Sequence, residues 1–334
     1  MTKEDVYRQA VALIENSSKV LITTHTRPDG DACGCVAAMW AVLTNLGKAV
    51  RPLLLSPLPQ WYRFVFREKV LILGQDVQSQ DLMRGEFSDI DLVIIVDTNS
   101  YSQLPRLEDY LKQAGKAILV IDHHVTSDGL GRVEITDPTA AAAGVVLFDF
   151  LKHAGWPVTR EVAEALFVAI ATDTGWFQLN NTDSRVYRTC AELVEIGADS
   201  ADLHRKLYHN YSYARFKLMV RMLDTLTLEL DGRYASQQIL LRDFAETAST
   251  VQDTENLVNE CHRIGSVQVS ALFVEQDDGR VRCSLRSQGE VDVSAIAAGF
   301  GGGGHHNAAG TFLPGPIEHA RQLIFDEVAR RLAG

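Results

Sequence analysis

Acidic and imidazole side chains gather near the start of the chain, in the stretch 25-HTRPDGDACG-34. His25, Asp29 and Asp31 fall within seven residues there, directly after the apolar run 19-KVLITT-24. Carboxylates held close together repel one another unless an opposite charge lies between them. Oxygen ligands combined with imidazole suit divalent cations such as Mn²⁺. The stretch therefore predicts a metal site, whereas its DGD segment alone would indicate only a solvated turn.

Further groups of the same residue types follow later in the sequence. They are Asp97, the triplet Asp122, His123 and His124, and Asp173. Each has an ordinary alternative, since a lone aspartate can cap a helix or end a turn, and a histidine pair can lie at the surface. Together they predict a site for two ions. One ion would bind His25, Asp29 and Asp97, and the other Asp31, Asp97, His123 and Asp173, so that Asp97 bridges the two.

A parallel β-sheet explains how residues so far apart could meet. Apolar runs at 19–24, 50–55, 90–97 and 117–122 alternate with expected helices at 32–46, 103–114, 139–153 and 159–171. Continuous Val/Ile/Leu strands separated by helices indicate a parallel sheet that is covered on both faces. Ligands of such sheets bind beyond the carboxyl ends of the strands. The histidine and aspartate groups follow three of these ends, which places them at one edge.

The second half of the chain predicts a different, smaller α/β domain. Consecutive helices are expected at 184–197 and 212–226, followed by a hairpin around Asp231-Gly232. A helix near 253–263, strands at 267–275 and 280–286, and a helix from about 316 complete the unit. We therefore predict an α/β protein with a metal-binding domain over 1–188, a helical connector over 189–226 and a substrate-binding domain over 227–334.

The segment 299-GFGGGGHHNAAG-310 is the second stretch with a chemical signal. Four consecutive glycines are expected to prevent regular secondary structure and to let the backbone approach an anionic ligand. The alternative is a flexible linker. Arg286, at the end of 280-RVRCSLR-286, could bind a phosphate through two parallel hydrogen bonds from its guanidinium group, or could be a surface charge on a strand.

Composition limits the class of protein and substrate. The chain has 334 residues, of which 46% are hydrophobic, and a net charge of −11. An acidic protein is poorly suited to gripping long nucleic acid, although bound cations would still permit a short phosphorylated substrate. The apolar segment 140-AAAAGVVLF-148 is too short to span a membrane, and the N-terminal helix lacks the apolar core of a signal peptide. We therefore expect a cytoplasmic protein whose five cysteines are reduced thiols.

Taken in order, the motifs 25-HTRPDGD-31, 96-VDT-98, 122-DHH-124 and 172-TDTG-175 resemble those of the DHH phosphoesterase superfamily. The later motifs 284-SLRS-287 and 301-GGGGHHNAAG-310 resemble its DHH-associated C-terminal domain. Within the superfamily, the chain is most similar to the NrnA-type enzymes. That resemblance implies Mn²⁺-dependent hydrolysis of nanoRNA (short 5′-phosphorylated oligonucleotides) and of 3′-phosphoadenosine 5′-phosphate (pAp), with Mg²⁺ or Co²⁺ as alternative metals.

The resemblance also implies roles for individual residues. His25, Asp29, Asp31, Asp97, His123 and Asp173 match metal ligands. Asp122 matches the acidic residue that supports the site, and His124 the histidine that faces the scissile phosphate. The substrate would be bound by Arg286, Ser287, Gly303, Gly304 and His305, with Arg263 as a further phosphate ligand; His306 is given no role.

The expected mechanism is attack of a metal-bridging hydroxide on phosphorus, with Asp97, Asp122 and His124 as catalytic residues. A phosphodiesterase for cyclic dinucleotides or their linear products remains an alternative, and an inorganic pyrophosphatase is another. An exonuclease for long strands, like RecJ, lacks support because no further nucleic-acid-binding domain is evident. A non-catalytic nucleotide sensor would have lost a metal ligand, and none is missing. Partners are expected to be short oligonucleotides or nucleotide bisphosphates, with neither long duplexes nor membranes, and a homodimer is left open.

Overall fold

The computed structural model describes residues 2–84, 87–113, 115–209 and 211–332. The chain divides into two compact units, residues 1–210 and 211–334. This division lies within the connector expected over 189–226. Helices α6 (Ser184–Ile196) and α7 (Ser200–Tyr208) belong to the first unit, whereas α8 (Tyr213–Asp224) belongs to the second.

The first unit contains a parallel sheet of six strands in the order β3-β2-β1-β4-β5-β6. Val20 of β1 pairs with Val50 of β2 on one side and with Leu92 of β4 on the other. The predicted parallel α/β sheet is therefore confirmed, with two short edge strands, β3 and β6, that the sequence analysis did not foresee. The strands are β1 (Lys19–Thr23), β2 (Ala49–Leu54), β3 (Leu71–Ile72), β4 (Leu92–Val96), β5 (Ala117–Asp122) and β6 (Val133–Thr136).

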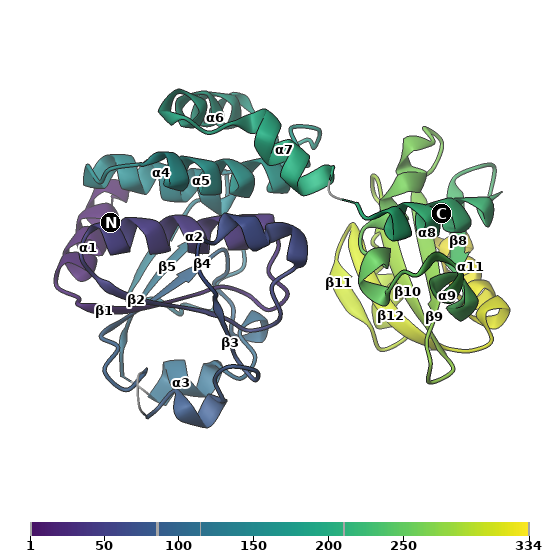
Figure 1. Ribbon diagram of the computed structural model, residues 1–334, viewed down its shortest axis with the longest axis horizontal. Coiled ribbons are helices and arrows are strands. Elements are labelled where there is room, and N and C mark those ends of the chain that lie inside the picture. Colours follow the sequence, from purple (N-terminus) through teal and green to yellow (C-terminus); the bar gives the residue numbers. More distant parts are fainter. Residues whose placement is uncertain (1, 85–86, 114, 210, 333–334) are drawn as a thin grey trace. The chain divides into compact units, whose positions relative to one another are not determined.

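Both faces of this sheet are buried, as expected for a parallel sheet. One face is covered by α1 (Lys3–Glu15), α2 (Gly30–Asn45), α4 (Ala143–Ala154) and α5 (Arg160–Asp173), and the other by α3 (Glu108–Gln113) with its neighbouring loops (Figure 1). Alternate residues of β4 point into the hydrophobic cores on the two faces of the sheet. Leu92, Ile94 and Val96 pack in the core beneath α1, α2, α4 and α5, and Val93 and Ile95 pack in the core beside α3.

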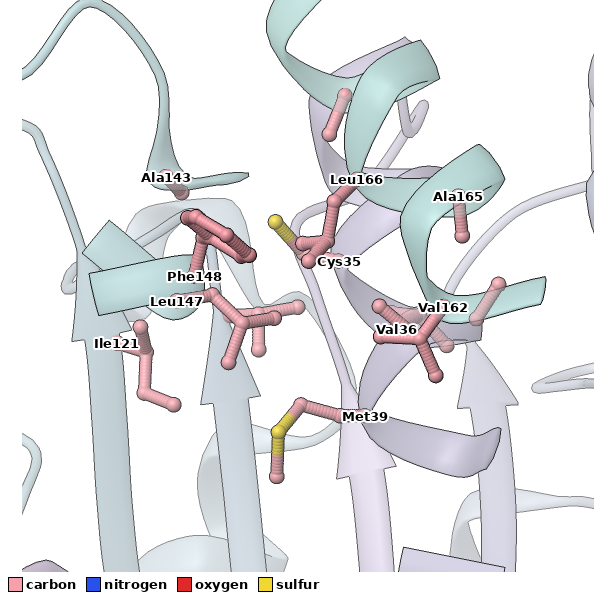
Figure 2. Close-up of a cluster of buried hydrophobic side chains, with 14 of the residues drawn as sticks. Cys35, Val36, Met39, Ile121, Ala143, Leu147, Phe148, Val162, Ala165 and Leu166 are labelled. Carbon is pink, nitrogen blue, oxygen red and sulfur yellow. The ribbon is translucent and has the colours of Figure 1, made fainter. Parts of the chain in front are cut away.

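Helix α2 packs directly on α5 in the larger of these cores. Figure 2 shows Cys35, Val36 and Met39 of α2 among side chains of α4 and α5. The two helices approach closely because two positions of α2 have no side chain. A Cβ at Gly34 would lie 2.4 Å from the carbonyl oxygen of Ala165, and a Cβ at Gly30 would lie 2.2 Å from Thr172 Oγ1.

Two helix predictions in this unit began too early. The helix expected over 103–114 begins only at Glu108 and is described as far as Gln113; Pro105 disfavours helical geometry at the residue before it. The helix expected over 139–153 begins at Ala143, and Ala142 before it is extended, with φ −157° and ψ 151°. The residues before Ala143 form a turn whose polar backbone groups face the site described below.

The second unit is a mixed six-stranded sheet in the order β11-β12-β10-β9-β8-β7. The predicted hairpin is present, since Glu229 pairs antiparallel with Tyr234 across the turn. Helices α10 and α11 cover one face of the sheet, and α8 covers the other. The elements are β7 (Thr227–Glu229), β8 (Tyr234–Ile239), α9 (Leu241–Thr247), β9 (Val269–Glu275), β10 (Arg280–Ser287), α10 (Val293–Ala298), β11 (Gly303–His305), β12 (Ala308–Pro314) and α11 (Ile317–Leu332).

Two predictions for the second unit were wrong. The helix expected near 253–263 is a pair of 3₁₀ segments, Val251–Thr254 and Leu257–Arg263, separated at Asn256, whose φ is 58°. The glycine run does not exclude regular structure, because Gly303 and Gly304 form part of β11 beside β12. A Cβ at Gly304 would lie 2.4 Å from the carbonyl oxygen of Ala308. At this position, glycine therefore permits close approach to the protein's own backbone.

All five cysteines are buried and unpaired. In the part of the chain that the structure describes, no helix combines the length and the apolar character needed to cross a membrane.

Candidate metal centre

The predicted metal ligands meet at the carboxyl edge of the first sheet. Strands β1, β4 and β5 are neighbours there, and the chain continues from them into His25, Asp97 and the Asp122–His124 triplet. The strand order reverses between β1 and β4, and such switch points are where open α/β sheets bind ligands. The start of α2 contributes Asp29 and Asp31, and the end of α5 contributes Asp173.

Side-chain ligand atoms gather there in three overlapping groups, and within each group all atoms lie within 4.8 Å of one another. Two of the groups share Asp97, and two share His123. The groups are His25, Asp29 and Asp97; Asp97, His123 and His124; and Asp31, His123 and Asp173. The structure thus brings together all six residues expected to hold metal, together with His124. One expected set, His25, Asp29 and Asp97, forms a group of its own, whereas the other is divided, with Asp31, His123 and Asp173 in one group and Asp97 beside His123 in another.

Asp97 lies between two imidazoles. Its Oδ2 is 3.4 Å from His25 Nε2, and its Oδ1 is 3.5 Å from His123 Nε2. On the far side of His123, the same Nε2 is 3.6 Å from Asp173 Oδ2 and 3.9 Å from Asp31 Oδ2. The site is therefore a chain of alternating carboxylates and imidazoles, in which Asp97 is the central carboxylate.

Backbone carbonyl groups fix the orientation of both imidazoles. His25 Nδ1 donates to the carbonyl oxygen of Thr26 at 2.9 Å, and His123 Nδ1 donates to that of Ala140 at 3.1 Å. A carbonyl can only accept, so the proton of a neutral ring lies on Nδ1 and the lone pair lies on Nε2. Such outer contacts orient metal-binding histidines in proteins. Both Nε2 atoms are consequently directed toward the carboxylates.

Asp122 accepts hydrogen bonds from both histidines that follow it in the sequence. Its buried Oδ1 accepts a hydrogen bond from the backbone N–H of His123 and another from His124 Nδ1, both at 2.8 Å. The hydrogen bond from His124 to Asp122 raises the pKa of the imidazole. The side chain of His124 is 45% exposed, in contrast to 16% for His123. His124 is therefore oriented by Asp122 but remains accessible to a substrate.

The buried charges shift each other's pKa values strongly. Burial would raise the pKa of the Asp97 carboxyl, but the two neighbouring imidazoles outweigh it and lower the pKa to about 2. Burial would lower the pKa values of the histidines, but the carboxylates outweigh it and raise them to about 9 for His25 and about 10 for His123. Asp173 has its pKa raised to about 7 by burial and by the charge of Asp97.

The residues fit a pair of divalent cations. Asp97 Oδ1 is buried and lacks a hydrogen-bond donor among the described residues, and Asp31 is 1% exposed. Buried carboxylates require pairing with positive charge. Moreover, Asp97 has a left-handed backbone with φ 59°, a costly conformation that proteins retain chiefly at functional sites. Oxygen and imidazole donors in this arrangement suit Mn²⁺, Mg²⁺ or Co²⁺.

We expect metal to stabilise the protein more strongly as the pH rises. The raised pKa values of His25 and His123 give the metal-free protein stability that is complete below about 6.5, the ordinary histidine value, and is lost as the pH passes 9 to 10. The raised pKa of Asp173 also makes the metal-free protein less stable as the pH rises. This loss begins above the ordinary aspartate pKa of 3.8 and is complete once the pH passes about 7, because the buried carboxyl must then ionise. Cations would replace the lost protons.

Melting temperatures measured with a chelator and with Mn²⁺ at pH 6.5, 8 and 9.5 would check this expectation. The difference between the two curves should widen with pH. A constant or narrowing difference would contradict the pairing of these histidines with the buried carboxylates.

The predicted substrate residues of the second unit occupy different environments. Arg286, on β10, is partly buried, and its Nη1 donates to the carbonyl oxygen of Leu285 at 2.9 Å; burial lowers its pKa. Ser287 is buried, and its Oγ donates to the carbonyl oxygen of Val291 at 2.7 Å. Arg263 is 82% exposed and pairs with Glu260 at 2.9 Å. Of the two arginines, Arg286 has the more buried guanidinium and Arg263 the more exposed one.

The glycine run lies at the edge of the same sheet. Gly303 has open space around its Cα, whereas Gly304 lies against β12. The backbone of His305 completes β11, but the predicted contact of its side chain lies outside the described part of the structure. The roles assigned to these residues stay predictions.

Comparison with known families agrees with this geometry. The family described as "DHH family, N-terminal domain" matches residues 19–170, and the "DHHA1 domain" matches residues 233–334. The chain therefore contains a DHH-family N-terminal domain and a DHHA1 domain. These two domains confirm the resemblance seen in the sequence motifs, and with it the class of metal-dependent phosphoesterases.

Several known proteins match the chain along nearly its full length. The bifunctional oligoribonuclease and PAP phosphatase NrnA of Thermus thermophilus is 28% identical, over 94% of this chain and 90% of its own. The cyclic-di-AMP phosphodiesterase GdpP of Geobacillus thermodenitrificans is 26% identical, over 95% of this chain but 48% of its own. Among solved structures, an exopolyphosphatase-related protein from Bacteroides fragilis has a TM-score of 0.90 and 25% identity, covering 99% of this chain and 98% of its own.

Two further candidate residues were not predicted from the sequence motifs. Arg282 lies on the same face of β10 as Arg286, and its Nη2 donates to Thr254 Oγ1 at 2.5 Å. The even spacing of the two arginines along a strand would have revealed it, because alternate residues share a face. Asn181 contacts the metal centre indirectly through backbone groups, and nothing in the local sequence marks it.

Proposed function

We propose that this protein hydrolyses phosphoester bonds in short 5′-phosphorylated oligonucleotides and in pAp, with Mn²⁺ as its metal. The observation that carries the proposal is the convergence of four carboxylates and three imidazoles in overlapping groups that share Asp97 and His123. The substrate class is supported by the nearly full-length similarity to an oligoribonuclease and PAP phosphatase.

The residues divide into two ligand sets around Asp97. His25 and Asp29 would hold one ion, and Asp31, His123 and Asp173 the other, with Asp97 common to both. Divalent cations bound there would lower the pKa of water and neutralise phosphate charge. The protein itself contributes the fixed Nε2 lone pairs of both histidines and the buried carboxylates that would otherwise repel one another.

His124 would act on the substrate directly. Asp122 holds its Nδ1, so that Nε2 of the half-exposed ring is left for the phosphate. A protonated imidazole in this orientation would neutralise charge on the phosphoryl oxygens or donate a proton to the leaving oxygen. Asp122 would be a positioning residue, since it touches the imidazole and not the substrate.

The second unit would supply phosphate-binding groups of its own. Arg286 offers a partly buried guanidinium, which suits two-point binding of a phosphate, and the open backbone at Gly303 lies on the same sheet. A net charge of −11 disfavours long nucleic acid. We therefore place the substrate limit at a few nucleotides.

A second candidate function is hydrolysis of cyclic dinucleotides or their linear products. The similarity to a cyclic-di-AMP phosphodiesterase over 95% of this chain favours it. The chain spans less than half of that relative, however. The two functions would share the metal centre and differ in the shape of the bound substrate.

One substrate panel separates these functions. Purified protein with Mn²⁺, Mg²⁺ or Co²⁺ would be offered pAp, 5′-phosphorylated oligonucleotides of two to ten residues, cyclic di-AMP and pyrophosphate. We expect the highest kcat/KM with Mn²⁺ on pAp or the shortest oligonucleotides, at least about tenfold above the longest, since a long strand finds no basic track. Preference for cyclic di-AMP would support the second candidate. Fastest turnover of pyrophosphate or of the longest strands would refute both.

A further inference from the structure

The run of small residues that leads into α4 contacts the metal centre through its backbone. We call residues 140–144, with the sequence AAAAG, the alanine turn. Its first carbonyl group, that of Ala140, accepts the hydrogen bond from His123 Nδ1 at 3.1 Å. The turn thereby sets the direction in which His123 presents Nε2.

The other end of the alanine turn binds Asp31. The backbone N–H of Ala143 donates to Asp31 Oδ2 at 2.5 Å, and that of Gly144 donates to Asp31 Oδ1 at 2.9 Å. These groups lie in the first turn of α4, where N–H groups lack partners within the helix. Both oxygens of a metal-binding carboxylate are therefore held in place. A larger residue would not fit at Gly144, because its Cβ would lie 2.8 Å from Ala169 Cβ.

Asn181 links the middle of this turn to the end of α5. Its Nδ2 donates to the carbonyl oxygen of Ala141 at 3.2 Å and to that of Asp173 at 3.1 Å. The side-chain amide has two N–H donors, and each is used on one of the two segments. The carbonyl of Asp173 belongs to the same residue whose carboxylate faces His123.

The position of Asn181 is itself anchored to the alanine turn. Arg185, four residues later in α6, donates to Asp137 at 2.8 Å and to Asp149 at 2.7 Å. Asp137 lies three residues before the alanine turn, and Asp149 lies further along α4. Because Arg185 joins α6 to both ends of this region, the segment that carries Asn181 remains beside the turn.

We propose that Asn181 is a positioning residue for the metal centre, acting through the alanine turn. Its amide holds the turn, which orients His123 and Asp31, in register with the end of α5, which carries Asp173. These three residues form one of the ligand groups. The proposal rests on the proposed metal-dependent function, but it concerns metal binding and is testable without a substrate. Outer contacts of this kind typically contribute about 10- to 100-fold to metal affinity.

Calorimetric titration of chelator-treated, full-length protein with Mn²⁺ tests the proposal. Asn181→Asp keeps the size of the side chain but replaces two donors with a carboxylate that would repel both carbonyl groups, and Asn181→Ala removes the donors without adding charge. We expect the dissociation constant of the weaker Mn²⁺ site to rise about 10- to 100-fold in both variants. At saturating Mn²⁺, kcat should return to within about threefold of the parent, with KM unchanged.

The adjacent residue provides a matched control. Asn180 is exposed, as Asn181 is, but its side chain makes no hydrogen bond to the described residues. Asn180→Asp and Asn180→Ala therefore make the same chemical changes one position away and should leave Mn²⁺ affinity unchanged. Unaltered affinity in the Asn181 variants would overturn the proposal. So would equal weakening in the Asn180 variants, or a fall of more than about 8 °C in the melting temperature of both metal-free Asn181 variants, which would indicate general destabilisation. A failed substrate panel with the expected Mn²⁺ result would refute only the proposed function.

Discussion

Asp97→Asn should reduce kcat/KM by about 10³-fold or more at saturating Mn²⁺. Asp97 is the carboxylate common to both proposed ligand sets, and it lies between His25 and His123 at 3.4 and 3.5 Å. The amide keeps the shape of the side chain but removes its charge and half of its acceptor capacity. Asparagine is also among the few residues that tolerate the left-handed backbone at this position, with φ 59°. The loss would therefore report on charge and ligation, with little effect of backbone strain.

A steady-state assay with pAp, together with the far-UV circular dichroism spectrum, would measure this effect. Asp109→Asn is a suitable control, because Asp109 is an exposed residue of α3 on the opposite side of the sheet. It should leave turnover within about twofold of the parent. Turnover of Asp97→Asn close to that of the control would rule out a shared, central role for Asp97.

Gly34→Ala is expected to lower the free energy of unfolding by about 2–4 kcal/mol. In an isolated helix this change would stabilise by about 1 kcal/mol, since alanine is the better helix former. Here the new Cβ would lie 2.4 Å from the carbonyl oxygen of Ala165 and 2.9 Å from the backbone nitrogen of Ala169. Neither is a flexible side chain, so relief requires α2 and α5 to move apart and to expose part of the core between them.

Urea unfolding of Gly34→Ala and Gly265→Ala would compare their free energies of unfolding and show how much the clash between α2 and α5 contributes. Gly265 has open space around its Cα and an ordinary backbone conformation, so its substitution should change stability by less than about 0.5 kcal/mol. Separation of α2 from α5 should also weaken Mn²⁺ binding, because Asp31 lies at the start of one helix and Asp173 at the end of the other. A Gly34→Ala protein as stable as the parent would contradict the close packing of these helices.

Much of the candidate metal centre could be predicted from sequence alone because its proposed ligands follow elements with strong local signals. The runs that became β1, β4 and β5 are continuously apolar, which is typical of buried parallel strands. In a parallel sheet, all carboxyl ends share one edge, so the positions of His25, Asp97 and His123 after these runs placed them together before any coordinate was known. The chemistry of the donors then indicated divalent cations.

Predictions failed where a structure depends on a neighbouring segment. Residues 139–142 have helical composition, yet the helix starts at Ala143 because the preceding carbonyl groups bind His123 and Asn181. The glycines at 303 and 304 were expected to be irregular, and their edge strand exists because β12 supplies its hydrogen-bond partners. The helix or strand propensity of a segment does not indicate which distant residues will form hydrogen bonds with it.

Sequence by itself determined the identity of the donors, the parallel sheet and the edge at which the donors lie, because apolar runs and residue chemistry are local properties. Tertiary structure alone decided the left-handed backbone of Asp97, the contact of Gly34 with α5 and the link from Asn181 to Ala141 and Asp173. These features depend on distances between segments remote in the sequence, such as the 40 residues that separate Asn181 from Ala141. Such pairs leave no periodic pattern, since only the folded chain brings them within hydrogen-bonding distance.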